Sequence, residues 1–172
     1  IVLEVYRGCI RGCRFCQAGQ LYRPVRERNL EFLKKYAIAM LENTGHEEIS
    51  LSSLSSSDYS QLPELIDFLI EECSRRKINI SLPSLRIDAF SLDVMNKVQD
   101  VKKSSLTFAP EAGSQRLRNV INKGLTEEVI LNGAKLAFEG GWTRVKLYFM
   151  LGLPFETEED IRGIGELSNK IA

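Results

Sequence analysis

Strand-like and helix-like segments alternate along the whole of this 172-residue chain. The expected strands are short apolar or alternating runs, at Val2–Tyr6, Glu48–Leu54, Lys77–Leu82, Ser104–Phe108 and Thr143–Leu151. The expected helices carry apolar residues at helical spacing, at Leu30–Glu42, Leu62–Arg76, Leu92–Gln99, Gln115–Ile121, Glu127–Glu139 and Glu158–Ile171. An alternating order implies parallel strands joined by right-handed crossovers, which gives either a doubly wound sheet or a barrel. Because a complete (β/α)8 barrel typically takes ~250 residues, this length fits a partial barrel.

The alternation of polar and apolar residues predicts which face of the sheet each side chain occupies. In the last expected strand, Val145, Leu147 and Phe149 alternate with Lys146 and Tyr148. Helices cover the outside of such a sheet, so the apolar set should face them and Lys146 and Tyr148 should face the interior. The other strands then place polar side chains inside, at Glu4, Tyr6, Ser50, Ser52, Asn79, Ser81, Ser105 and Thr107. A register shifted by one residue would exchange the two faces.

Several expected helices begin at residues that can cap them. Side-chain oxygens suited to this role occur at Asn29, Ser91, Ser114 and Thr126. Thr157 and Asp160 resemble a capping box, and Gly140-Gly141 suits the end of a helix. Local start and stop signals therefore agree with the alternating pattern.

Composition narrows the classes of protein that fit. The chain has 23 basic and 23 acidic residues, so it lacks the net positive charge of a typical nucleic-acid-binding domain. Residues 23–28 form a short basic loop that could meet RNA or a phosphate, or simply be solvated. No apolar run reaches the ~18 residues of a membrane span, and thiols gathered in one motif predict a reducing cytoplasm. The chain begins inside an expected strand and ends inside an expected helix, so we expect a fragment of a longer protein.

Cys9, Cys13 and Cys16 form a C-x3-C-x2-C motif directly after the first expected strand. Cysteine thiolates are the usual ligands of [4Fe–4S] clusters, and three of them would leave one iron open to bind another molecule. The alternatives are a zinc knuckle and a partial ferredoxin site, but zinc takes four closed ligands and the only histidine, His46, is distant in sequence. Cys73 continues the apolar stripe of an expected helix, so we expect it in the core and not on the cluster.

The C-x3-C spacing with Phe15 just before the last cysteine resembles the signature of radical S-adenosylmethionine (SAM) enzymes. The resemblance implies that the open iron binds the amino and carboxylate groups of SAM, which an electron then splits into methionine and a 5′-deoxyadenosyl radical. It also implies an α/β fold, a partial (β/α)6 TIM-like barrel of parallel strands. Here that barrel should be truncated after the fifth βα unit, with the sixth strand expected beyond Ala172. Residues 1–172 would then form one radical SAM core domain.

The runs at the ends of the second and fourth strands resemble SAM-binding motifs of this family. Radical SAM enzymes carry a Gly-Gly-Glu-like motif after the second strand. This chain has serines there and looks instead like the methylthiotransferase branch. Glu111-Ala112-Gly113-Ser114 resembles a Glu-Ser-Gly-Ser run of the B12-binding branch, in which the glutamate contacts the SAM ribose or amine and the glycine allows close backbone approach. Asn122-Lys123-Gly124 follows, as it does in the B12-binding branch. A serine-rich turn and a helix cap at Ser114 are the structural alternatives.

Other expected SAM contacts follow from charge, register and resemblance. Arg86 can clamp a carboxylate of SAM or substrate, or form a structural salt bridge. Leu153 lies in a Gly-Leu-Pro run whose counterpart lines the adenine pocket in similar enzymes. The expected SAM-binding residues are Phe15, Ser52, Ser53, Ser55, Arg86, Glu111, Lys146, Tyr148 and Leu153.

The sequence most resembles an uncharacterised branch in which a B12-binding-like domain and a radical SAM core share one chain. This resemblance implies an enzyme that modifies a substrate, RNA or protein among the candidates, by methylation or methylthiolation. It also implies a flavodoxin- or ferredoxin-type reductant, no membrane partner, and cobalamin in a neighbouring domain. The alternative is a module that holds a cluster for electron transfer, or senses SAM, without radical catalysis.

Overall fold

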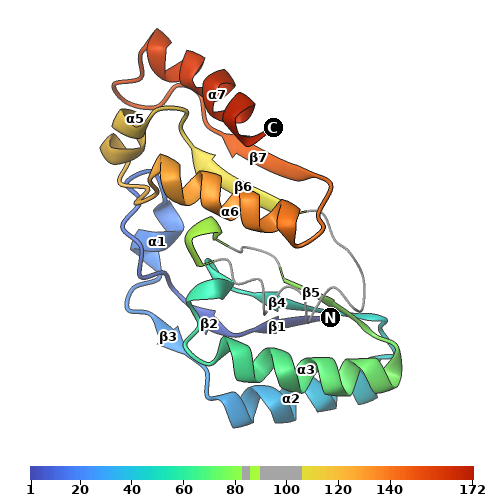
Figure 1. Ribbon diagram of the computed structural model, residues 1–172. Coiled ribbons are helices and arrows are strands. Elements are labelled where there is room, and N and C mark those ends of the chain that lie inside the picture. The colour runs from blue at the N-terminus through green and yellow to red at the C-terminus, as the bar shows by residue number, and fades with distance from the viewer. Residues whose placement is uncertain (83–85, 90–105) are drawn as a thin grey trace.

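The computed structural model describes residues 1–82, 86–89 and 106–172, and it has an α/β fold in which parallel strands alternate with helices (Figure 1). The strands are β1 (Val2–Glu4), β2 (Tyr6–Arg7), β3 (Arg26–Glu27), β4 (Glu48–Ser52), β5 (Asn79–Ser81), β6 (Leu106–Glu111) and β7 (Val145–Phe149). The α-helices are α1 (Gln17–Leu21), α2 (Leu30–Thr44), α3 (Leu62–Arg76), α5 (Gln115–Val120), α6 (Glu127–Glu139) and α7 (Glu158–Ile171). Two 3₁₀ turns, η1 (Ser56–Asp58) and η2 (Ile87–Ala89), follow β4 and β5. The expected helix Leu92–Gln99, its cap Ser91 and the interior position Ser105 lie outside the described residues.

The parallel strands form two separate sheets. One sheet has the order β1-β4-β5, and the other pairs β6 with β7. Among the described residues no ladder joins β5 to β6, so the expected continuous five-stranded barrel wall is seen as two half-sheets. None of the helices in these residues is long and apolar enough to cross a membrane.

The first expected strand divides at Val5. The Val5 N–H donates to the Ser52 carbonyl at 3.0 Å, as a continuation of the β1-β4 pairing, while the Val5 carbonyl accepts from Arg28 at 3.0 Å. Beyond this point the chain turns into β2, which pairs antiparallel with β3. The expectation of one strand over Val2–Tyr6 is therefore wrong, because the backbone groups of Val5 pair with two different partners.

The helices cover one face of each half-sheet. In Figure 1, α2 and α3 lie along the β1-β4-β5 sheet, whereas α6 and α7 flank β6 and β7. The predicted caps are present: side-chain oxygens of Asn29, Ser114 and Thr126 accept backbone N–H groups at 3.0–3.2 Å. The Asp160 carboxylate accepts the Thr157 N–H at 2.8 Å, and Gly140 is the C-cap of α6.

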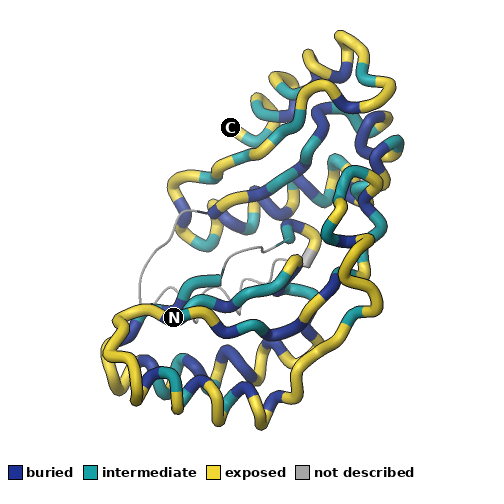
Figure 2. Tube along the Cα trace, turned by 180° about the vertical axis from the view of Figure 1, so that it is seen from behind, coloured by how far each residue is buried: buried dark blue, intermediate teal, exposed yellow. Residues whose placement is uncertain are grey.

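The predicted faces of the strands are confirmed. Leu3, Ile49, Leu51 and Ile80 are buried against α2 and α3, and a second core unites β6 and β7 with α6 and α7. The polar alternates on the other face are partly or well exposed: Glu4, Ser50, Ser52, Asn79, Ser81, Thr107, Lys146 and Tyr148. Figure 2 shows the same alternation of buried and exposed positions along the strands and helices. Tyr6 is the exception: it was expected in the interior but is 1% exposed and belongs to the first core.

Gly113 and Gly163 let the loop after β6 lie directly against α7. A β-carbon at Gly113 would lie 2.3 Å from the Ile164 nitrogen and 2.6 Å from the Asp160 carbonyl oxygen. The expected close approach at Gly113 is therefore present, but it is made to the backbone of α7, which fixes the loop that follows Glu111.

We expect Gly113→Ala to lower the free energy of unfolding by about 1–3 kcal/mol, because the added methyl group would clash with the backbone of α7. The matched control is Gly165→Ala in α7, the helix against which Gly113 packs, because a β-carbon at Gly165 would meet nothing within 4 Å. That change should raise the free energy of unfolding by about 0.5–1 kcal/mol, since alanine loses less backbone entropy in a helix. Urea unfolding measures both; equal stability of Gly113→Ala and the parent protein would contradict the contact.

Candidate active site

The cysteine loop leaves β2 at Gly8 and returns into α1. Gly8 has φ of 96°, and a β-carbon there would lie 2.4 Å from the Tyr22 carbonyl oxygen, so only glycine fits. Cys13 is buried, while Cys9 and Cys16 are half-buried. The backbone N–H groups of Arg11 and Gly19 donate to Cys9 Sγ and Cys16 Sγ, each at 3.4 Å. Two of the three candidate ligands therefore already accept backbone N–H groups.

The chemistry of this loop fits an iron–sulfur cluster better than a single metal ion. Across 1–82, 86–89 and 106–172, no three Cys, His, Asp or Glu side chains converge closely enough to hold one ion. A four-iron cluster is larger than an ion and takes thiolates from more widely spread positions. The three loop thiols are free, and backbone N–H groups of the kind that tune cluster sulfurs already point at two of them.

Cys73 lies in the core, as predicted. It is fully buried on α3 among the side chains of the first half-sheet. Burial raises the pKa of the Cys73 thiol to about 11, so the thiol stays protonated at neutral pH. A protonated core thiol is a poor metal ligand, since it is the thiolate that binds metal.

The turn after α5 is the platform on which the cysteine loop rests. The Arg14 N–H donates to the Ile121 carbonyl at 2.9 Å, and Asn122 Nδ2 donates to the Gly12 carbonyl at 2.8 Å. Lys123 Nζ lies 5.8 Å from the centre of the Phe15 ring, a cation–π contact. The sequence reveals the Asn122-Lys123-Gly124 run but not its role in supporting the cysteine loop. The only local indication is its turn-forming composition, which suits the positive φ of both Asn122 and Gly124.

Glu111 ends β6 with its side chain directed to the same platform. Its carboxylate accepts from Lys123 Nζ at 3.1 Å, and both side chains are largely buried. Its carbonyl accepts from the Met150 N–H at 2.8 Å, which ties it to the end of β7. Glu111 has φ of 69°, a conformation that costs free energy for a residue with a side chain and that clusters at functional sites.

The serine run after β4 forms a turn beside a pocket. Ser52 and Ser53 line a cavity of about 390 Å³ together with Glu4, Tyr6, Arg7, Gly8, Tyr22 and Leu54. The Ser53 hydroxyl accepts from the Ser55 N–H at 3.2 Å, and Ser55 itself is 1% exposed. The Tyr6 hydroxyl donates to the Ser55 carbonyl, and burial raises the pKa of Tyr6 to about 12. Ser52 and Ser53 therefore face the pocket, whereas Ser55 is held beneath the turn.

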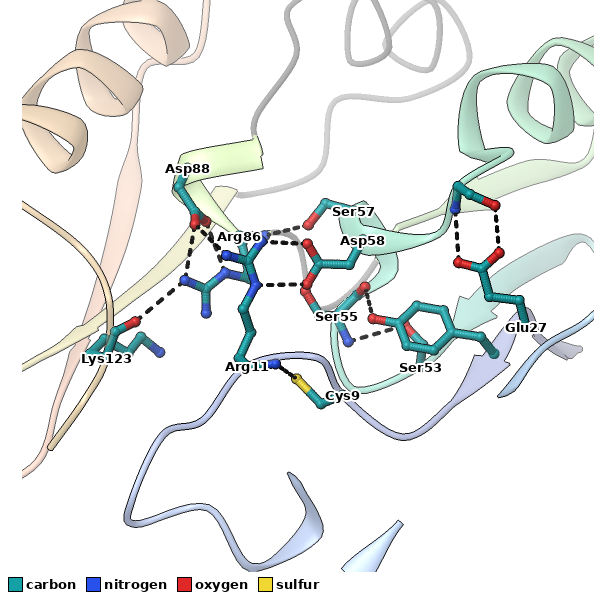
Figure 3. A network of polar contacts seen from close by, with 12 residues as sticks. Cys9, Arg11, Glu27, Ser53, Ser55, Ser57, Asp58, Arg86, Asp88 and Lys123 are labelled. Carbon is teal, nitrogen blue, oxygen red and sulfur yellow. Dashed lines mark hydrogen bonds and ion pairs between the residues drawn. The ribbon is translucent and has the colours of Figure 1, made fainter. Parts of the chain in front are cut away.

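Arg86 is engaged by Asp88. Its Nε and Nη2 atoms donate to the two carboxylate oxygens at 2.9 and 3.1 Å, and Nη2 also reaches the Lys123 carbonyl at 3.5 Å. Its backbone N–H donates to the Ser57 hydroxyl at 3.2 Å. The structural salt bridge that the sequence left open is therefore present, and it links the ends of β4 and β5 to the Lys123 turn (Figure 3).

Arg11 adds a second pair to this network. Its guanidinium donates to Asp58 through Nε at 3.0 Å and through Nη2, and Nη1 lies 3.3 Å from Asp88 (Figure 3). Burial would raise the pKa of Asp58, but hydrogen bonds from Arg11 and Ser55, together with the positive charges of Arg11 and Arg86, hold that pKa below its ordinary value. The pKa of Arg11 is raised, chiefly by the bond to Asp58. Sequence reasoning missed Arg11, Asp58 and Asp88, because partners far apart in the chain leave no local pattern.

The end of β7 contributes apolar and exposed groups. Leu153 is buried in a small apolar cluster with Ala112, Leu117 and Ile121, against which Phe15 packs. Lys146 Nζ lies 4.8 Å from the centre of the Tyr148 ring, and both residues are exposed on the face away from α6 and α7. Phe15 and Leu153 are thus brought to the platform of the cysteine loop, while Lys146 and Tyr148 contact each other on the open interior face.

Comparison with known proteins decides the family. The model of the radical SAM superfamily matches residues 3–167. The chain belongs to the radical SAM superfamily. This superfamily uses a [4Fe–4S] cluster and SAM, and Cys9, Cys13 and Cys16 carry its cysteine spacing.

Two relatives come from Methanocaldococcus jannaschii. One, an uncharacterized protein, is 41% identical over 170 residues, covering 99% of this chain and 37% of the relative. The other, provisionally named a methylthiotransferase, is 25% identical over 169 residues, covering 93% of this chain and 37% of the relative. This radical SAM chain therefore spans a little over a third of the length of these relatives.

The fold is shared with solved radical SAM enzymes. The methyltransferase TsrM from Kitasatospora setae, solved with cobalamin and a [4Fe–4S] cluster, superposes with a TM-score of 0.76 at 13% identity. The match covers 99% of this chain and 32% of TsrM. The two half-sheets thus correspond to a radical SAM partial barrel, and within the described residues that barrel is not closed.

Proposed function

We propose that residues 1–172 form the radical SAM core of a longer enzyme, with Cys9, Cys13 and Cys16 holding a [4Fe–4S] cluster. The observation that carries this proposal is the cysteine loop: three free thiols on one loop at the carboxyl ends of the strands, with Cys73 buried elsewhere. When bound, the cluster supplies the electron that cleaves SAM to methionine and a 5′-deoxyadenosyl radical. Three protein ligands leave an iron for SAM, which favours this reaction over simple electron transfer.

The chain's own residues have distinct proposed roles toward SAM. Glu111, held in position by Lys123, would accept hydrogen bonds from the amine or ribose, and Ser52 and Ser53 would offer hydroxyls from the pocket beside the loop. Phe15 and Leu153 form an apolar cluster against which an adenine ring could pack. Lys146 and Tyr148 remain proposed contacts of SAM. Arg86 and Ser55 are proposed to act on SAM binding through the ion-pair network and the serine turn that they support.

The proposed outcome is methylation or methylthiolation of a substrate such as RNA or a protein. Support comes from the relative named as a methylthiotransferase and from the fold shared with TsrM, a methyltransferase solved with cobalamin. Cobalamin in a neighbouring domain and a flavodoxin- or ferredoxin-type reductant complete the proposal.

The full-length chain, reconstituted anaerobically with iron and sulfide and given SAM and dithionite, should form 5′-deoxyadenosine and methionine in equal amounts. Chromatography of the quenched reaction measures both products. A matched Cys13→Ala protein should form neither, because one ligand of the cluster is lost. An intact cluster without any 5′-deoxyadenosine from the parent protein would instead favour an electron-transfer or SAM-sensing module.

A further inference from the structure

Arg11, between Cys9 and Cys13, is held at each of its polar groups. Its N–H donates to Cys9 Sγ at 3.4 Å, and its carbonyl accepts from Arg23 Nη2 at 3.3 Å. Its guanidinium meets Asp58 and Asp88, which follow two different strands. A single residue therefore connects a cluster thiol to the ends of β4 and β5.

The surroundings of Arg11 distinguish it from the other arginines of the region. Its side chain is 31% exposed and that of Asp58 only 7%. The comparable pair between Arg7 on β2 and Glu4 on β1 has the same two-bond geometry, but its side chains are 54% and 33% exposed. Exposed pairs contribute little because solvent screens them. A partly buried, doubly bonded pair fixes geometry more strongly, since breaking it leaves a buried carboxylate without its partner.

The position of the loop between the half-sheets explains why such fixing matters. Through Gly12 and Arg14 the loop is bonded to Asn122 and Ile121, which follow β6 and α5. Through Arg11 it is bonded to the first half-sheet, and in the described part of the chain no strand ladder joins the two halves. The spacing of the thiols thus depends on two sets of bonds: those of Arg11 to the first half-sheet, and those of Gly12 and Arg14 to the turn after α5.

We propose that Arg11 is a positioning residue for the iron–sulfur cluster, acting through Asp58 and Asp88 to hold the loop segment that carries Cys9 and Cys13. This inference rests on the proposed function. Groups that orient metal ligands without touching the metal typically change metal affinity by about 10- to 100-fold when removed. The same range is expected here, because Arg11 sets the ligand-bearing backbone and provides no ligand itself.

The test compares cluster retention in the reconstituted full-length chain. With a ferrous-iron chelator in excess, Arg11→Met should lose its visible absorbance about 10- to 100-fold faster than the parent. Asp58→Asn should lose it faster as well, and the double variant should be no worse than Arg11→Met, because both changes break one connection. Arg11→Lys, which keeps the charge but lacks the planar fork, should fall between. The EPR line shape of the reduced cluster should change in Arg11→Met.

The matched control is Arg75→Met, which removes an exposed pair with Glu71 near the end of α3, away from the cysteine loop, and should leave retention and EPR line shape unchanged. Unfolding of the apoproteins separates positioning from general destabilisation. The inference is overturned if Arg11→Met retains its cluster as long as the parent protein does. It is also overturned if the apoproteins of Arg11→Met and Arg11→Lys are destabilised to the same extent as their cluster loss is accelerated, since general destabilisation would then explain the loss. A parent protein that takes up no cluster would overturn the proposed function as well, so the two failures are distinguishable.

Discussion

Alanine at Cys9, Cys13 or Cys16 should each abolish the [4Fe–4S] absorbance of the reconstituted chain, whereas Cys73→Ala should keep it. Each loop cysteine would supply one of three ligands, so its removal leaves too few thiolates to hold the cluster. Cys73 lies in the core between α3 and the first half-sheet, and its raised pKa keeps its thiol protonated. Iron and sulfide content after anaerobic reconstitution, together with the visible spectrum, measures the result.

The Cys73 variant is the internal control because it is the one cysteine outside the motif. Cys73→Ala removes a small buried group, so its unfolding should be measured alongside. A folded Cys73→Ala protein that binds no iron would show that the cluster takes a ligand from the core, and the three-ligand proposal would fail. Full iron content in Cys9→Ala would be equally decisive against it.

The faces of the strands could be predicted because side chains alternate with a strict period of two. Val145, Leu147 and Phe149 reveal the buried face of β7 without any knowledge of their partners, and the helix caps at Asn29 and Ser114 are similarly local. The break at Val5 could not be predicted, because its cause is the separate bonding of one residue's N–H and carbonyl to Ser52 and Arg28.

In the candidate site, too, features set by neighbouring residues could be predicted, and features set by residues distant in sequence could not. The ligand motif Cys9–Cys16 is contiguous, so its spacing alone indicates a cluster. The supports of that loop are not contiguous: Asn122 lies 110 residues from Gly12, and Asp58 lies 47 residues from Arg11. The Glu111-Ala112-Gly113-Ser114 run predicts a close backbone approach at its glycine, but only the structure shows that the backbone next to Gly113 is that of α7.

Glu111 is the most informative of the proposed SAM contacts because its environment is already built around a negative charge. Lys123 pairs with it at 3.1 Å, and the cation also lies over the Phe15 ring beside Cys16. The positive φ of Glu111 directs this side chain at a conformational cost, which fits a residue kept for function. The amine and sulfonium of SAM carry positive charge, so a carboxylate here would attract the ligand as well as hydrogen-bond to it.

We expect Glu111→Gln to weaken SAM binding to the reconstituted full-length chain by about 10- to 100-fold. Losing a hydrogen bond to a charged group costs roughly 1.5–3 kcal/mol, which corresponds to that range. Glutamine keeps the size of the side chain and can still accept a bond from Lys123, so the fold and the iron content should be retained. The control is Glu42→Gln, which breaks a surface pair with Arg76 at the far ends of α2 and α3 and should leave SAM affinity unchanged. Titration calorimetry measures both affinities; an unchanged value for Glu111→Gln with full iron content would remove Glu111 from the SAM site.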